Sequence, residues 1–367
     1  MSKSMNAKMN GKKSALCVLL AGMLWGCMGI LVRTMNEGGF TSLEVTAFRS
    51  LVTAVLMLVG MAVFKRKELK VKWKDLWCFA GTGILSVAFF NVCYFTCMHY
   101  TTLSVAAILL YTAPSFVMVL SFFLFKEKIG GRKLLALGLA FVGCVLTSGG
   151  LPGLGGVFGS GAAGFGIEGG VLGVGAVGFW VEGGSLGVGA AGLEAGLAGA
   201  LGRTPLSAMG LLTGLGAGFG YALYGIFGKY AILRGYSSYT ITTYTFLFAL
   251  IGTVPFLDLG HFGGCIVGAG SSLFLYAFLT FMTTVAAYLF YTTGLKGLEN
   301  GRASIIASIE PVMASLVGFF LYKEAFSLPG ILGMILILAS CVLVERKERT
   351  SILAEFSGRY GGNWSHS

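Results

Sequence analysis

Long apolar stretches recur along almost the whole chain, and they limit its fold more than any other feature. A helix of roughly 17 to 25 apolar residues can cross a hydrocarbon core of about 30 Å. We predict ten such spans, approximately at residues 15–35, 43–64, 76–98, 101–125, 133–149, 206–229, 239–257, 271–295, 302–322 and 328–344. Only 11% of the residues are charged, whereas soluble domains carry about a quarter. The chain is therefore predicted to be an all-α integral membrane protein.

The basic residues indicate how these spans are oriented. A net charge of +11 could point to an anionic partner such as nucleic acid, so the positions of the charges matter more than their sum. With the N-terminus inside, only Arg33, Arg203 and Lys323 fall outside and Arg49 lies within the second span, while the rest of the 26 Lys and Arg residues lie inside. This is the asymmetry of the positive-inside rule. We expect both termini to be cytoplasmic, the bilayer to surround the protein, and no nucleic-acid partner.

An internal repeat relates the two halves of the chain. An offset of 197 residues aligns residues 94–127 with 291–324 without a gap, and the segment from Phe122 to Glu127 matches that from Phe319 to Glu324. Five spans per copy, an odd number, make the second copy enter the membrane in the opposite sense. Inverted repeats underlie many secondary transporters, whose solute sites lie near the midplane between the halves. The same architecture also occurs in channels, so this functional inference is by analogy.

The two predicted repeats cover residues 14–149 and 206–344, between a cytoplasmic N-terminal segment (1–13) and a basic cytoplasmic tail (345–367). The connection between them, residues 150–205, is rich in glycine: residues 149–202 contain 22 of the 58 glycines and no Lys or Arg. Such a density of glycine opposes a stable helix. One crossing by this insert would move the later basic loops outside, so it crosses twice or not at all, and we favour an outer loop.

The eight cysteines are scattered, and no disulfide framework follows from their spacing. Cys93 and Cys97 share a helix face, but the three histidines are dispersed along the chain, so no metal site and no cofactor are expected. Cys265 stands alone in an outer loop.

Several motifs resemble the EamA-type branch of the drug/metabolite transporter superfamily. They are Leu24-Trp25-Gly26, Phe48-Arg49, Leu103-Ser104-Val105-Ala106-Ala107 with Pro114, Phe125-Lys126-Glu127, Ile309-Glu310-Pro311 and Lys323-Glu324. The resemblance covers both halves and implies ten helices in two five-helix EamA units, with transport of amino acids, sugars, nucleotide-linked compounds or amines. It also implies a bacterial plasma membrane. The long glycine-rich insert departs from the family pattern, and Thr245 stands near the position that would match Arg49.

Two ionisable residues lie deep within predicted spans, where a charge costs about 2.5 to 3.5 kcal/mol on insertion scales. Glu310 is a candidate for coupling transport to a proton or for binding a cationic group, and Arg49 for holding a substrate carboxylate. In the alternative interpretation the two pair with each other, or with backbone freed by Pro311, and are structural.

Polar and aromatic side chains at helical spacing form a candidate cavity lining around these two residues. Its members are Trp25, Asn91, Tyr94, Tyr111, Ser115, Tyr221, Tyr224, Thr284, Tyr288, Tyr291 and Ser308. Taken singly, each is better explained by packing between helices, whereas the set as a whole favours a cavity lining. Pro114 and Pro311 occupy matching positions within helices, where a missing N–H permits a hinge or a static kink.

The favoured function is a secondary transporter of a small organic solute, such as an amino acid or amine, with possible export and a proton as candidate coupling ion. A solute channel is the nearest alternative. A membrane-embedded enzyme is less favoured because no catalytic cluster, zinc spacing or phosphate loop emerges from the sequence. The sequence does not specify the oligomeric state.

Overall fold

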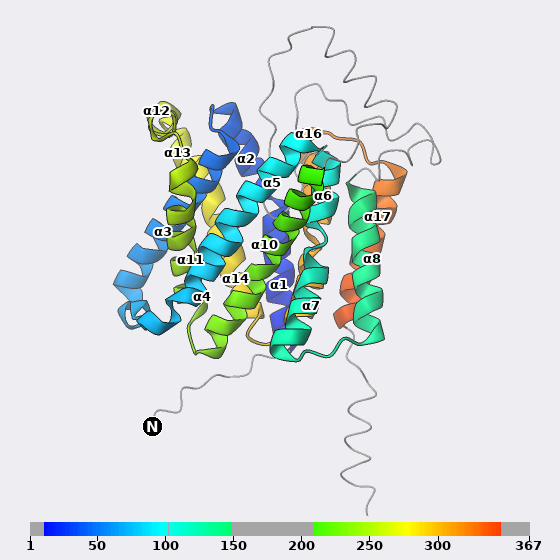
Figure 1. Ribbon diagram of the computed structural model, residues 1–367. Coiled ribbons are helices and arrows are strands. Elements are labelled where there is room, and N and C mark those ends of the chain that lie inside the picture. The colour runs from blue at the N-terminus through cyan, green and yellow to red at the C-terminus, as the bar shows by residue number, and fades with distance from the viewer. Residues whose placement is uncertain (1–10, 102, 149–207, 346–367) are drawn as a thin grey trace, which may run out of the picture.

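The computed structural model describes residues 11–148 and 208–345, apart from position 102. Helices run up and down through both halves (Figure 1). The first half contains α1 (Gly11–Gly26), α2 (Met28–Glu37), α3 (Ser42–Phe64), η1 (Arg66–Leu69), η2 (Trp73–Asp75), α4 (Leu76–Ala80), the π-helical η3 (Gly81–Ala88), α5 (Phe89–Tyr100), α6 (Leu103–Leu110), α7 (Ala113–Phe125) and α8 (Gly131–Thr147). The second half contains α10 (Ala208–Leu233), α11 (Ser238–Thr253), η5 (Val254–Phe256), α12 (Leu259–Ala269), α13 (Ser272–Thr280), the π-helical η6 (Phe281–Ala286), α14 (Ala287–Gly294), α15 (Asn300–Ala307), α16 (Glu310–Tyr322) and α17 (Leu328–Glu345).

Nine helical segments within these described ranges are long and apolar enough to cross a membrane. The tenth span is α8, whose 17 residues reach about 25 Å at 1.5 Å per residue and which packs along α17. The predicted fold class, ten spans in two inverted five-helix repeats, is confirmed. The predicted N-terminal segment up to residue 10, the glycine-rich insert and the tail beyond residue 345 lie outside the described residues.

The structure contains an α-helix where the sequence analysis predicted a loop. Helix α12 follows span seven and is too short to cross the membrane, since it has 11 residues. In Figure 1 it is seen nearly along its own axis, across the direction of the bundle helices. Asp258 caps it by accepting hydrogen bonds from the backbone N–H groups of Gly260 (2.9 Å) and His261 (3.1 Å).

The two repeats end their fourth span in the same way. Lys126 and Lys323, which are 197 residues apart, both adopt the left-handed conformation, with φ of 54° and 56°. In each case the next residue, Glu127 or Glu324, donates its backbone N–H to a carbonyl in the last turn of the helix, at 3.2 Å. The sequence match at this motif therefore reflects a shared way of ending a helix.

The repeats interlock through their first spans. Helix α1 packs against α14, α15 and α16 of the second repeat, while α10 packs against α5, α6 and α7 of the first. The second spans pair as α3 with α11, and the fifth spans pair as α8 with α17 at the edge of the bundle (Figure 1). The spans that carry most candidate site residues thus meet at the centre.

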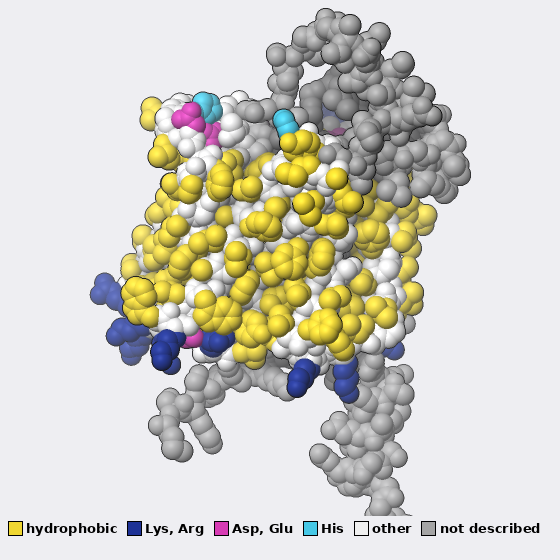
Figure 2. All heavy atoms as spheres, in the orientation of Figure 1, with side chains coloured by type: hydrophobic (Ala, Val, Ile, Leu, Met, Phe, Trp, Pro, Cys, Tyr) yellow, Lys and Arg dark blue, Asp and Glu magenta, His cyan; other side chains and the backbone are white. Residues whose placement is uncertain are grey.

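Basic side chains gather at one end of the bundle, beside the start of α1, below a broad apolar belt (Figure 2). We call this end the basic face; it carries Lys67, Lys133 and Arg234. Lys133 forms an ion pair with Glu299 of the other repeat at 2.5 Å, and Arg234 forms one with Asp75 at 2.9 Å. Polar contacts between the repeats therefore close this end.

Two further contacts at the basic face order its connections. Tyr236 donates a hydrogen bond to Asp75 at 2.7 Å, and burial together with this bond raises the pKa of Tyr236. The Glu127 carboxylate accepts from the backbone N–H groups of Asn300 (2.8 Å) and Gly301 (3.2 Å). The end of the first repeat's fourth span thus caps α15, the start of the second repeat's fourth span.

Candidate functional site

The fourth span of each repeat is broken at the same place. Tyr111 and Thr112 separate α6 from α7, and Ser308 and Ile309, 197 residues later, separate α15 from α16. Ser308 and Ile309 donate to carbonyls three residues back, at 3.2 Å each, instead of four residues back. Since α15 has eight residues, this break lies about 12 Å along span nine from the basic face. Both breaks therefore occur near the middle of the bundle.

Glu310 is the first residue of α16 and is buried, with 3% of its surface exposed. Its Oε1 atom has no hydrogen-bond partner. Within the described part of the chain no Lys, Arg or His forms an ion pair with it. A buried carboxyl with an unsatisfied oxygen and no counter-charge is costly for a protein that has only to fold.

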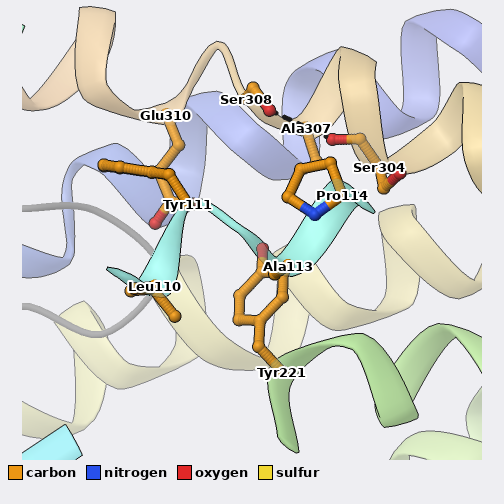
Figure 3. A pocket seen from close by; sticks show the side chains of 9 residues that line it. All are labelled: Leu110, Tyr111, Ala113, Pro114, Tyr221, Ser304, Ala307, Ser308 and Glu310. Carbon is orange, nitrogen blue, oxygen red and sulfur yellow. Dashed lines mark hydrogen bonds between the residues drawn. The ribbon is translucent and has the colours of Figure 1, made fainter. Parts of the chain in front are cut away.

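A cavity opens beside this carboxyl at the two breaks (Figure 3). We call it the carboxyl cavity, and it is lined by Leu110, Tyr111, Ala113, Pro114, Tyr221, Ser304, Ala307, Ser308 and Glu310. Tyr111 as a whole is 7% exposed, and its buried hydroxyl also has no hydrogen-bond partner among the described residues. Five of the predicted site residues meet here: Tyr111, Pro114, Tyr221, Ser308 and Glu310.

A second cavity adjoins the first and is largely aromatic. We call it the aromatic cavity; its lining consists of Trp25, Ser86, Val87, Phe90, Tyr221, Tyr224, Tyr288 and Tyr291. Trp25 is central, with its ring centroid 5.2 Å from that of Tyr288 and 5.1 Å from that of Tyr291. Its indole nitrogen is buried without a hydrogen-bond partner. Tyr221 lines both cavities, so the two cavities are neighbours.

Arg49 lies apart from Glu310. Its Nε donates a hydrogen bond to Thr284 Oγ1 at 3.1 Å, and its side chain is 3% exposed. Direct pairing of Arg49 with Glu310, one alternative raised by the sequence, does not occur in this structure.

The remaining predicted residues do not line either cavity, although Asn91 and Tyr94 contact residues that do. Asn91 donates to the Val87 carbonyl at 2.6 Å and accepts from Thr46 at 3.3 Å. Tyr94 is fully buried and stacks on Phe90, with ring centroids 5.8 Å apart. Ser115, in the first turn of α7, does not belong to either lining.

The prolines stand at a specific point of the two broken spans. Pro114 and Pro311 are each the second residue of the half-helix that follows the break. A proline in the first turn does not break the hydrogen-bonding of its own helix. The interruption instead precedes each proline, and whether it moves stays a prediction.

Sequence reasoning did not select Ser86, Val87, Phe90 or Leu110 as lining residues. Ser86, Phe90 and Tyr94 follow one another at intervals of four, which places them on one helix face. That spacing was available in the sequence. An apolar Phe in a membrane span, however, looks the same whether it faces a cavity or the lipid.

This combination of groups favours ligands that carry positive charge. A carboxylate attracts a proton or a cation, and the faces of Trp and Tyr rings attract ammonium groups through their quadrupoles. Because Glu310, Trp25 and Tyr288 are buried, these interactions are less screened than at a protein surface.

Comparison with known proteins agrees with this architecture. The model of the EamA-like transporter family matches residues 12–149 and 208–346, once in each half. An uncharacterized transporter of Archaeoglobus fulgidus is 25% identical over 91% of this chain and 97% of its own length. The uncharacterized transporter YwfM of Bacillus subtilis is 24% identical over 95% of this chain and its full length.

A solved structure shares the fold. A crystallised protein with 13% sequence identity matches with a TM-score of 0.61, covering 94% of this chain and 98% of its own. At this identity the likeness concerns the fold alone.

Proposed function

This chain belongs to the EamA-like transporter family, and from that premise we propose that it exchanges a small organic cation, such as an amine, for protons across the plasma membrane. The observation that carries the proposal is Glu310: a buried carboxyl without counter-charge, at the break of span nine, facing a cavity. Solute export fits such an exchange, because protons entering the cell would drive amines outward.

The proton and the cation compete for the same carboxylate in this mechanism. Protonated Glu310 is neutral, which suits its burial when no solute is bound. A bound ammonium group replaces the proton and leaves the site neutral again. Each state is thus electrically balanced, while the charged and empty carboxylate is disfavoured. This mutual exclusion couples the two flows.

In this proposal the aromatic cavity binds the uncharged part of the solute. Trp25, Tyr288 and Tyr291 offer ring faces and edges close to one another, and Tyr221 connects them to the carboxyl cavity. An amine with an apolar or aromatic body would place its charged end at Glu310 and its body among these rings. Amino acids would also need a partner for their carboxylate, for which Arg49 is the nearest candidate.

Alternating access follows from the inverted repeats. The two broken spans, α6–α7 and α15–α16, would exchange conformations as one repeat rocks against the other about the central site. A channel would need a continuous polar path, whereas the aromatic cavity is lined mainly by aromatic and apolar side chains. The positive-inside rule, applied to the basic face, supports cytoplasmic termini.

The decisive experiment measures proton release driven by solute. Purified protein in proteoliposomes, with a pH-sensitive dye in the lumen, is exposed to a panel of primary amines, quaternary ammonium compounds and amino acids. We expect amines or quaternary ammonium compounds to drive a proton flux, and their affinity to fall as the pH is lowered because protons compete. Glu310→Gln should abolish the proton flux and weaken binding at least about tenfold, or about 1.4 kcal/mol.

Glu324→Gln is the matched control, since Glu324 follows the end of the same span, outside both cavity linings. It should leave the flux unchanged. If Glu310→Gln retains pH-dependent exchange, Glu310 is not the coupling group. If only amino acids are active and Arg49→Gln abolishes their binding, the solute class proposed here is wrong.

A further inference from the structure

A second cluster of reactive side chains lies at the end of the bundle opposite the basic face. Glu44, His261 and Cys265 each present one donor atom there, and the three atoms lie within 4.8 Å of one another. His261 Nδ1 is 2.8 Å from Glu44 Oε1, and Cys265 Sγ is 3.8 Å from each nitrogen of the His261 ring. In Figure 2 histidine and acidic side chains lie together at this rim, where Figure 1 shows α12.

The fold holds each of the three groups in place. His261 and Cys265 are four residues apart on α12 and therefore share one helix face. Glu44 is the third residue of α3 and only 2% exposed. Its Oε2 accepts from the backbone N–H of Thr41 at 2.8 Å as part of a capping box, which leaves Oε1 directed at His261.

The chemistry of the set matches a transition-metal ion. Imidazole, thiolate and carboxylate are the ligands of Zn²⁺ and its neighbours, whereas Ca²⁺ and Mg²⁺ need a shell of oxygens. Tetrahedral bonds of roughly 2.0 Å to N and O and 2.3 Å to S put ligand atoms about 3.3 to 3.6 Å apart. Two of the observed separations, 2.8 and 3.8 Å, bracket this range, and all three donor atoms lie within 4.8 Å of one another. Modest side-chain movements would therefore admit an ion.

We propose that Glu44, His261 and Cys265 form a binding site for a divalent transition-metal ion of the Zn²⁺ type. The ion would have three protein ligands, with a fourth position for water or for the Gly39 carbonyl oxygen, which lies 3.6 Å from Cys265 Sγ. Cys265 would bind as the thiolate, releasing its proton to solvent. This proposal does not depend on the solute or coupling ion proposed above.

Such an ion would join the two repeats. It would tie α12, between spans seven and eight of the second repeat, to the outer end of α3 in the first. Arg49 lies on α3 five residues after Glu44, so a bound ion would also restrain the segment that carries Arg49. We therefore expect α12 and the start of α3 to be less mobile when the metal is bound.

Cobalt(II) is the probe, because a thiolate ligand gives it a charge-transfer absorption that oxygen and nitrogen ligands do not. The full chain, with its affinity tag removed and metals stripped by chelator under reducing conditions, is titrated with Co²⁺ and then with Zn²⁺. We expect one Co²⁺ per chain with a thiolate band, displacement of that band by Zn²⁺, and a higher Tm with Zn²⁺ than with chelator.

Three variants and two controls decide the assignment. Cys265→Ser should remove the thiolate band. His261→Gln and Glu44→Gln should each weaken Zn²⁺ binding at least about tenfold. The Gln at position 44 can still accept the hydrogen bond from the Thr41 N–H, so the helix cap is kept. Cys17→Ser and His99→Gln should bind as the parent does. As a folding control, the Tm and the size-exclusion elution volume of each variant are measured without metal and should equal those of the metal-free parent. Absence of a thiolate band in the parent, or its persistence in Cys265→Ser, would overturn the proposal.

Discussion

The close contact between the repeats at their centre depends on single residues such as Gly26. A Cβ atom built on Gly26 would lie 2.6 Å from the Glu310 carbonyl oxygen and 2.5 Å from Met313 Cβ. Gly218 on α10 has the equivalent place against the other broken span, where its Cβ would lie 2.6 Å from Thr112 Oγ1. At each of these positions the first span of one repeat approaches the break of the other, which requires a residue without a side chain.

Replacing Gly26 should therefore destabilise the protein at its centre. We expect Gly26→Ala to cost about 1 to 3 kcal/mol, because a backbone carbonyl cannot move aside as a flexible side chain can. The measurement is the Tm of the purified protein in detergent. Gly138→Ala on α8 is the control, since nothing lies within 4 Å of a Cβ there. Equal Tm values for the two variants would contradict this account of the contact.

At the scale of elements, the broken fourth spans carry the functional hypothesis. Pro311 cannot donate to the Ala307 carbonyl, and we expect this missing bond to help keep α15 and α16 separate. Pro114 stands at the same point between α6 and α7. A break that both repeats share is what an exchange of conformations between them would use.

Pro311→Ala tests whether the break has to be kept. The new N–H can donate to Ala307, which favours a continuous helix by about 1 kcal/mol, or roughly fivefold. We expect stronger hydrogen-exchange protection of residues 308–312 and slower transport, with the fold retained. Pro329→Ala, in the first turn of the uninterrupted α17, should change neither. Unchanged protection and transport in Pro311→Ala would show that the proline does not set the break.

At the scale of the whole molecule, the distribution of basic residues predicts which end of the bundle lies on which side of the membrane. The basic face is expected inside, and α12 with Cys265 outside. A membrane-impermeant maleimide, added with a metal chelator, should therefore label Cys265 in intact cells, and Cys265→Ser should lose this label. Lys67→Cys in the Cys265→Ser background should be labelled only after permeabilisation. Labelling of Lys67→Cys in intact cells would reverse the orientation.

Much of this architecture could be predicted from the sequence for a physical reason. In lipid the backbone must satisfy its own hydrogen bonds, so a long apolar segment has almost no alternative to a helix. The number of spans, their inversion and the candidate Glu310 follow from local hydropathy, the 197-residue offset and the cost of a buried charge. These three predictions do not require the packing or the rotation of the helices to be known.

Which side chains meet depends on the tertiary structure. Arg49 bonds to Thr284 and not to Glu310, and Tyr221 lines two cavities. Glu44 meets His261, which lies 217 residues later in the sequence, together with Cys265. The rotation of each helix about its axis depends on packing against its neighbours. In a membrane span both the lipid-facing and the interior side are apolar, so periodicity does not reveal that rotation. Local sequence patterns therefore predict the spans, their order and candidates such as Glu310, whereas the grouping of side chains into sites depends on packing between the helices.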